Sequence, residues 1–95
     1  MSVSDIRYTH IANYIRLTEV SNDDITLLNN LIDIATAFIK SYTGVSDLDE
    51  YDDFVIVVFI LCQDMYDTRT MYVDKNNLNK VVETILGMHS NTNIC

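Results

Sequence analysis

The segment from Phe54 to Cys62 contains nine consecutive residues without a polar side chain, and no other part of the chain is so uniformly apolar. A segment that is apolar on all sides is stable in water only if other parts of the protein cover it. The run is too short to cross a bilayer, which needs about 20 apolar residues. We therefore expect it to be the core element of a soluble domain, with the rest of the chain packed around it.

The residue types in this run favour a strand, whereas its surroundings favour a helix. Val55–Ile60 are all β-branched or aromatic, which is typical of a buried strand. Carboxylates precede the run, where they would stabilise a helix N-terminus, and apolar positions continue at helical spacing to Met65 and Tyr66. No other stretch resembles a strong strand that could pair with this one. We predict one helix over Leu48–Arg69.

The clearest amphipathic pattern lies before this helix. Ser21 and Asn22 can cap a helix, and Asp23 and Asp24 follow at the positive end of its dipole. Apolar residues then recur at intervals of three and four, with polar residues on the opposite face. Gly44 stands just after the last apolar position, where a residue with a left-handed backbone conformation commonly ends a helix. We predict a helix over Asp23–Thr43.

Two weaker helices complete the prediction. Ser4 can cap a first helix over Asp5–Leu17. Asn76 or Asn77 can cap a fourth helix over Leu78–Leu86, which Gly87 can end. The chain lacks proline and has two glycines, which also favours helices over tightly turning strands. The predicted fold class is all-α: a small four-helix domain around a very apolar third helix, spanning residues 1–95, with a flexible polar tail at 88–95.

The charge balance restricts the kind of partner. The chain carries 14 acidic and 6 basic side chains, for a formal charge of −8. A protein that grips nucleic acid by its phosphates needs the opposite balance. Of the two cysteines, Cys62 lies in the apolar run and Cys95 is the last residue, so we interpret Cys62 as a buried apolar side chain and Cys95 as an incidental thiol. No targeting segment or lipidation motif is visible, which leads us to expect an intracellular, reduced protein without a membrane segment.

No pattern of residues indicates a catalytic or metal site. His10 and His89 are far apart in the chain and away from both cysteines, which disfavours zinc. The acidic connection at residues 45–53 lacks the glycine and ligand spacing of a calcium loop. No nucleophile elbow or glycine-rich phosphate loop is present. We predict no catalytic residue, no metal ligand and no cofactor, so the chain is not expected to be an enzyme.

Two known classes of small helical protein are also disfavoured. Acyl carrier proteins present Asp-Ser-Leu, whereas this chain has Ser46-Asp47-Leu48, with the first two residues exchanged. Helix-turn-helix proteins read DNA with a basic recognition helix. The two strongest predicted helices carry one basic residue each, Lys40 in the first and Arg69 in the second.

The order and spacing of the helices resemble a known family. A short helix ends in Tyr14-Ile15-Arg16-Leu17, a long one closes with Ile39-Lys40-Ser41-Tyr42-Thr43-Gly44, and the apolar one ends in Met65-Tyr66-Asp67-Thr68-Arg69 before a small fourth helix. Over nearly its whole length the chain resembles the head–tail connector, or adaptor, proteins of tailed bacteriophages and prophages, which are also described as DNA-packaging proteins. Many relatives have a longer or proline-bearing segment where this chain has Thr70–Asn77.

The resemblance implies a structural protein of the virion, located at the head–tail junction and assembled in the cytoplasm of the bacterial host. Such adaptors form a ring of about a dozen copies under the portal protein, extend the DNA channel and dock tail-completion or head-closure proteins. DNA passes through such a ring without specific binding. An acidic chain is compatible with this role, because like charge weakens contact with phosphate.

Subunit contacts in a ring join two different faces of the same chain, so opposite charges on separate faces are candidates. We expect the basic Arg16 and Arg69 of one copy to face the acidic segment of the next, and an exposed tyrosine such as Tyr72 to lie at a contact. The same charges are also compatible with an ordinary solvated surface. The candidate contact residues are Arg16, Asp47, Asp49, Glu50, Asp52, Asp53, Arg69 and Tyr72. The alternative function is a small acidic regulatory binding module, either a DNA mimic or an inhibitor of a host or phage protein.

Overall fold

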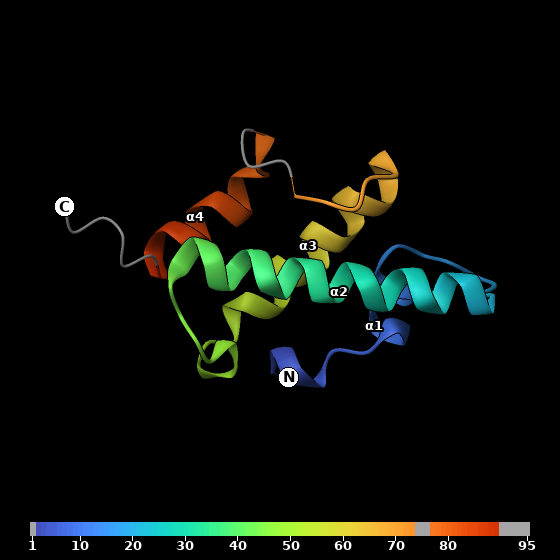
Figure 1. Cartoon of the computed structure of the whole chain (residues 1–95), viewed down its shortest axis with the longest axis horizontal. Helices are drawn as coiled ribbons and strands as arrows, with labels where there is room; N and C mark the ends of the chain where they lie inside the picture. Colours follow the sequence, from blue (N-terminus) through green and yellow to red (C-terminus); the bar gives the residue numbers. More distant parts are fainter. Residues whose placement is uncertain (1, 74–76, 90–95) are drawn as a thin grey trace.

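The computed structural model describes residues 2–73 and 77–89, and these residues form helices and connections without any strand (Figure 1). The predicted all-α fold class is therefore confirmed for this part of the chain. The elements, in chain order, are the 3-10 helix η1 (Val3–Asp5), α1 (Tyr8–Tyr14), α2 (Asn22–Thr43), the 3-10 helix η2 (Leu48–Glu50), α3 (Asp53–Thr68) and α4 (Lys80–His89).

Helix α3 lies at the centre of the arrangement, because it contacts α1, α2, α4 and η1. In Figure 1, α2 runs along the long axis of the molecule, α3 returns in the opposite sense behind it, and α4 runs back toward the start of α3. The structure thus has the predicted four-helix arrangement around a very apolar third helix.

The apolar run is helical but is not covered on all sides. The buried positions of α3 recur at intervals of three and four and make one face of the helix: Phe54, Val57, Val58, Leu61, Cys62 and Met65. Ile56, on the opposite face, is 39% exposed, so the expectation of burial all round was wrong. Four-helix packing leaves one side of α3 open to solvent even though its residues are apolar there.

The predicted start of this helix at Leu48 was also wrong. Leu48–Glu50 forms the separate turn η2, and Tyr51 then adopts an extended backbone that interrupts the helical path before α3 begins at Asp53. Leu48 itself is buried in the core, and η2 packs against η1. The far end agrees with the prediction to within one residue, since α3 ends at Thr68.

Helix α2 begins and ends as its sequence predicts. The Ser21 hydroxyl accepts a hydrogen bond from the Asp24 N–H at 3.2 Å, and the Asp24 carboxylate accepts one from the Ser21 N–H at 3.1 Å. At the other end Gly44 has a φ of 76° and donates its N–H to the carbonyl of Lys40 at 2.9 Å. This left-handed residue satisfies a carbonyl of the last turn and ends the helix.

The predicted first helix over Asp5–Leu17 was wrong in extent. Ile6 and Arg7 both have extended backbones, with ψ of 129° and 163°, and they divide the segment into η1 and α1. Ser4 does not cap a helix. The ring of His10 takes that role for α1, because its Nδ1 accepts the Arg7 N–H at 2.9 Å. Ile6 and Ile11 are both buried, so the break lets each piece place an isoleucine in the core.

Helix α4 also differs from its prediction at both ends. The side-chain oxygen of Asn79 accepts the Val81 N–H at 2.8 Å and caps the helix, which corrects the choice of Asn77, and Asn76 lies outside the described residues. Gly87 does not end the helix, which continues to His89. Of the predicted tail, Met88 and His89 are therefore helical, and residues 90–95 lie outside the described part of the chain.

Candidate functional site

Three of the five predicted acidic contact residues already have partners within the chain. We use the name acidic segment for residues 47–53. The carboxylate of Asp47 accepts the Asp49 N–H at 3.1 Å and caps η2. The carboxylate of Asp49 accepts the Ser4 N–H at 2.8 Å, and hydrogen bonds from Ser4 lower the pKa of Asp49. Asp49 therefore fastens the N-terminal segment to η2.

The third partnered carboxylate is Asp53, whose Oδ2 lies 2.9 Å from Nε2 of His89. The ring of His89 also packs against two aromatic rings, with centroid distances of 4.3 Å to Tyr51 and 4.9 Å to Phe54. The hydrogen bond with His89 is the main cause that lowers the pKa of Asp53. The sequence pattern predicted a flexible tail at His89 and gave no sign of this contact, which depends on the packing of α4 against α3.

The remaining two acidic residues are available to a partner molecule. Glu50 and Asp52 are exposed, and neither has a side-chain hydrogen bond or ion pair among the described residues. Glu50 and Asp52 are thus the two of the five predicted acidic residues whose carboxylates have no partner among the described residues.

The two predicted arginines occupy unusual and closely similar positions. Arg16 and Arg69 have φ values of 65° and 58°, and they are the only described residues other than glycine with a left-handed backbone. Arg16 donates its N–H to Asn13 O at 3.2 Å while the next residue, Leu17, donates to Ala12 O at 2.9 Å. This pair of bonds is the Schellman motif, which ends a helix by bonding its last carbonyl groups.

Helix α3 ends in the same way. Arg69 donates its N–H to Tyr66 O at 3.3 Å, and Thr70 donates to Met65 O at 3.0 Å. The Arg69 guanidinium lies 4.7 Å from the centre of the Tyr66 ring, whereas Arg16 has no such contact with any aromatic ring in the described part of the chain. Neither arginine forms an ion pair with any described residue. The left-handed position favours glycine, and it costs a residue with a Cβ atom about 1 kcal/mol or more.

The arginines and the acidic segment lie too far apart to pair within one chain. Helix α3 has 16 residues, so at 1.5 Å per residue Arg69 and Asp53 are separated by about 24 Å. Figure 1 shows the C-terminal end of α3 and the connection after α1 toward one side of the molecule, and the connection between α2 and α3 toward the other. The two arginines therefore stand on a different part of the surface from the acidic segment.

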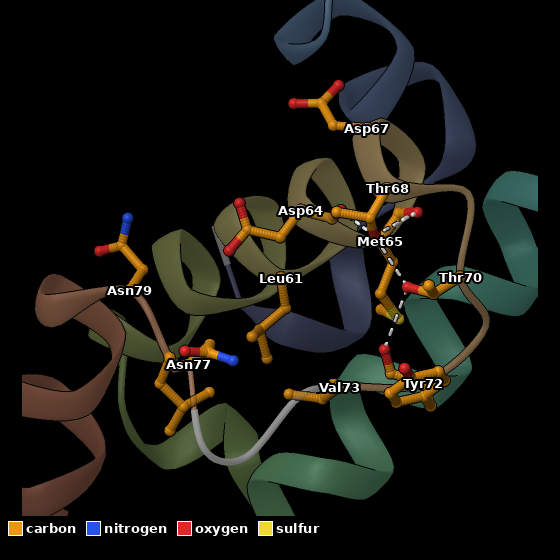
Figure 2. Close-up of a pocket in the computed structure, with 11 residues that line it drawn as sticks. Leu61, Asp64, Met65, Asp67, Thr68, Thr70, Tyr72, Val73, Asn77 and Asn79 are labelled. Carbon is orange, nitrogen blue, oxygen red and sulfur yellow. Dashed lines mark hydrogen bonds between the residues drawn. The ribbon is translucent and has the colours of Figure 1, made fainter.

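The last predicted contact residue, Tyr72, lines a groove at the C-terminal half of α3 (Figure 2). Its side chain is 62% exposed, and its neighbour Met71 is 47% exposed. We name this cavity of about 580 Å³ the α3 groove; its lining residues are Leu61, Asp64, Met65, Asp67, Thr68, Thr70, Tyr72, Val73, Asn77, Leu78 and Asn79. Sequence analysis did not identify it, because the residues before and after the α3–α4 connection come together only in the fold.

The described residues contain no group of three or more His, Cys, Asp or Glu side chains that could hold a metal ion. Cys62 is buried, and burial raises the pKa of its thiol to about 12, which makes it a poor nucleophile at neutral pH. In the part of the chain that the structure describes, no helix combines the length and apolarity that crossing a membrane requires.

Comparison with known proteins gives no relative for this chain. No protein-family model matches it, and no curated protein or solved structure is significantly similar to it. The functional argument therefore depends on the geometry of the chain itself.

Proposed function

We propose that this chain is the subunit of a ring-shaped head–tail connector of a tailed bacteriophage or prophage. The observation that supports the proposal best is the placement of two sets of charges that form no ion pair among the described residues: Arg16 and Arg69 end α1 and α3, whereas Glu50 and Asp52 belong to the connection between α2 and α3, which lies toward the other side of the molecule (Figure 1). A contact that repeats around a ring joins two different faces of one chain, which this distribution permits.

The backbone at the arginines gives the proposal a second support. Glycine would end α1 and α3 at lower cost than a left-handed arginine does. Part of the benefit of arginine is local, since a cation is favourable at a helix C-terminus and Arg69 lies on the Tyr66 ring. Within residues 2–73 and 77–89 Arg16 has no aromatic contact of this kind, so its charge is the better candidate for a bond to a neighbouring copy.

In the proposed assembly the ring lies below the portal protein and continues the channel through which DNA passes. The formal charge of −8 would keep the wall of that channel from holding the DNA, because the phosphates are repelled. Tail-completion proteins would dock on the ring. The proposed location is the head–tail junction of the virion, and assembly would take place in the host cytoplasm.

The test of the ring contact is an assembly assay with variants at both faces. Native mass spectrometry would measure the number of copies, both for the chain alone and for the chain mixed with the portal protein of the same genome. We expect rings from the unaltered chain and from the control Lys40→Gln/Lys80→Gln, and no rings from Arg16→Gly/Arg69→Gly. We expect all of these variants to keep the fold, because the substituted side chains are exposed, and circular dichroism would verify this.

A charge exchange makes the test specific. The variant Arg16→Glu/Arg69→Glu and the variant Glu50→Arg/Asp52→Arg should each fail to assemble alone. A chain that carries both sets of changes should form rings again, because the pairing is restored with reversed sign. A chain that stays monomeric at high concentration and with the portal protein would contradict the proposal. A one-to-one, salt-sensitive complex with a basic protein would instead support the small acidic binding module.

A further inference from the structure

The side of α3 that faces away from the core carries apolar residues. Ile56 is 39% exposed, and Phe59 and Ile60, on the next turn, are half-buried. Gln63 continues the same side one turn later, because residues three and four apart share a face of a helix. We name these four residues, Ile56, Phe59, Ile60 and Gln63, the open face of α3. An apolar helix face of this kind is stabilised in water when another surface covers it.

The two arginines stand toward one end of the open face. The ring of Tyr14, at the end of α1, lies 5.2 Å from the ring of Phe59, so the end of α1 flanks the open face. Arg16 follows two residues later, in the connection that Figure 1 shows toward the C-terminal end of α3. Arg69 ends α3 and lies over the Tyr66 ring. This end of the open face is therefore basic.

The other end of the open face is acidic. Glu50 and Asp52 are exposed and form no ion pair among the described residues. Asp52 has a helical backbone and precedes Ile56 by four positions, so it lies on the same side of α3. The two ends are about 24 Å apart along α3, too far to pair within one chain. Asp67 stands on the basic end, where one carboxylate is set against two arginines.

We propose that a second copy of the chain covers the open face of α3, with the two α3 helices antiparallel about a two-fold axis near Ile60. Ile56 of each copy then lies beside Gln63 of the other, and each acidic end meets the arginines of the other copy. Charge complementarity selects this occupant. An apolar face with opposite charges at its two ends is complementary to itself when it is turned end for end.

The dimer would regulate the ring contact, and this part of the inference rests on the proposed function. The dimer and the ring use the same four charged residues, Arg16, Glu50, Asp52 and Arg69. A copy held in the dimer therefore cannot enter a ring, and the dimer limits assembly away from the portal protein. A portal protein that binds single copies shifts the equilibrium from dimer to ring by mass action.

Sedimentation equilibrium of the full chain measures the dimer. We expect dimers from the unaltered chain, and we expect Ile56→Lys to raise the dissociation constant at least about tenfold. The control Val81→Lys changes an apolar residue of α4 that is 50% exposed, and it should leave the dissociation constant unchanged. Ile56→Lys should still form rings with the portal protein, because the ring contact uses the charged residues instead.

Cross-linking tests the two-fold axis. A two-fold contact brings the same residue of both copies together, whereas a ring contact joins different residues. In a Cys95→Ser background, Ile60→Cys should be joined to itself by a short bismaleimide and give covalent dimers. The control Val81→Cys should give single chains. Cys62 does not compete, because it is buried.

Failure of the dimer and failure of the ring are distinguishable. A chain that is monomeric alone but forms rings with the portal protein would overturn the dimer and leave the proposed function standing. Dimers that form no ring with the portal protein would support the dimer and contradict the proposed function. Equal dissociation constants for the Ile56→Lys and Val81→Lys variants, or no cross-link through Ile60→Cys, would also overturn the dimer.

Discussion

His89 Nε2 lies 2.9 Å from Asp53 Oδ2, so the last described residue of α4 is bonded to the first residue of α3. These residues are 36 positions apart in the sequence. The contact combines a carboxylate in the first turn of one helix with an imidazole in the last turn of another, and the dipole of α3 stabilises the Asp53 carboxylate.

This contact predicts a dependence of stability on pH. His89 lowers the pKa of Asp53, so the carboxylate contributes stability above its ordinary pKa of 3.8, and that contribution is lost as the pH falls through the lowered value of the folded chain. Because Asp53 is 39% exposed, we expect only about 0.5 kcal/mol. The free energy of unfolding, measured with urea, should differ less between pH 7 and pH 3 for His89→Phe than for the unaltered chain. This variant keeps a ring beside Tyr51 and Phe54.

The variant Asp53→Asn gives the control for this pH effect. It removes the titrating group and should reduce the difference between the two pH values by the same amount as His89→Phe. If either variant keeps the full difference, the stability at neutral pH does not come from this pair.

The two glycines predict opposite effects of alanine. Gly44 has a φ of 76°, and no atom lies within 4 Å of an added Cβ, so Gly44→Ala should lower the free energy of unfolding by about 1 kcal/mol through the backbone alone. Gly87 lies inside α4, and no atom lies within 4 Å of a Cβ added there. Gly87→Ala should therefore raise the free energy of unfolding by about 0.5–1 kcal/mol. Thermal unfolding measures both changes, and equal signs would disprove the assignment of these positions.

Adjacent residues of α3 predict unequal sensitivity to a hydroxyl group. Val57 is fully buried, so Val57→Thr should cost about 1–2 kcal/mol because the hydroxyl loses its hydrogen bonds to water. Ile56 is 39% exposed, and Ile56→Thr should cost less than about 1 kcal/mol. Denaturant unfolding of the two variants checks this order of destabilisation. The order would be reversed if Val57, rather than Ile56, pointed to the solvent.

The burial of Cys62 predicts a thiol that reacts only after opening of the fold. In a Cys95→Ser background Cys62 is the single cysteine. With its pKa raised to about 12, labelling by an aromatic disulfide reagent at pH 8 should be slower than for the urea-unfolded chain by several orders of magnitude. Equal rates in the folded and unfolded chains would show that the thiol is accessible.

Features with a local chemical cause could be predicted from the sequence. The capping residues Ser21 and Asp24, the apolar spacing of α2 and the glycine at position 44 each act within one turn of helix, so the bounds of α2 were predicted to within one residue. The helical character of α3 was also predicted, because the apolar positions beyond Cys62 keep a helical period.

Features that depend on competition between local sequence preferences and tertiary packing could not be predicted. The break at Ile6 and Arg7 has no proline or glycine to mark it, and it forms because both flanking pieces bury an isoleucine. Gly87 is a common stop signal, but here the packing of Val82, Leu86 and His89 continues the helix through it. Arg16 and Arg69 appeared to be ordinary helical residues, because glycine or asparagine is the usual signal for a left-handed end.

The candidate contact residues remain a prediction from the sequence, and their hydrogen bonds within the chain could not be predicted. The eight predicted contact residues do lie on the surface or at element ends, yet which carboxylates remain unpaired depends on contacts between distant segments. Ser4 and Asp49 are 45 positions apart, and no local pattern indicates that they bond. The α3 groove was missed for the same reason, since its walls are brought together by the packing of α4 on α3.

Helix α4 buries only Val82 and Leu86 completely, whereas α3 buries six side chains. The two helices therefore differ in the cost of detaching them from the rest of the domain. Backbone amide protons of α4 can exchange with deuterium by a local opening that breaks few apolar contacts, while those of α3 exchange only when the whole domain unfolds. Such an opening separates His89 from Phe54, so the chain can transiently expose an aromatic ring that is fully buried in its average structure.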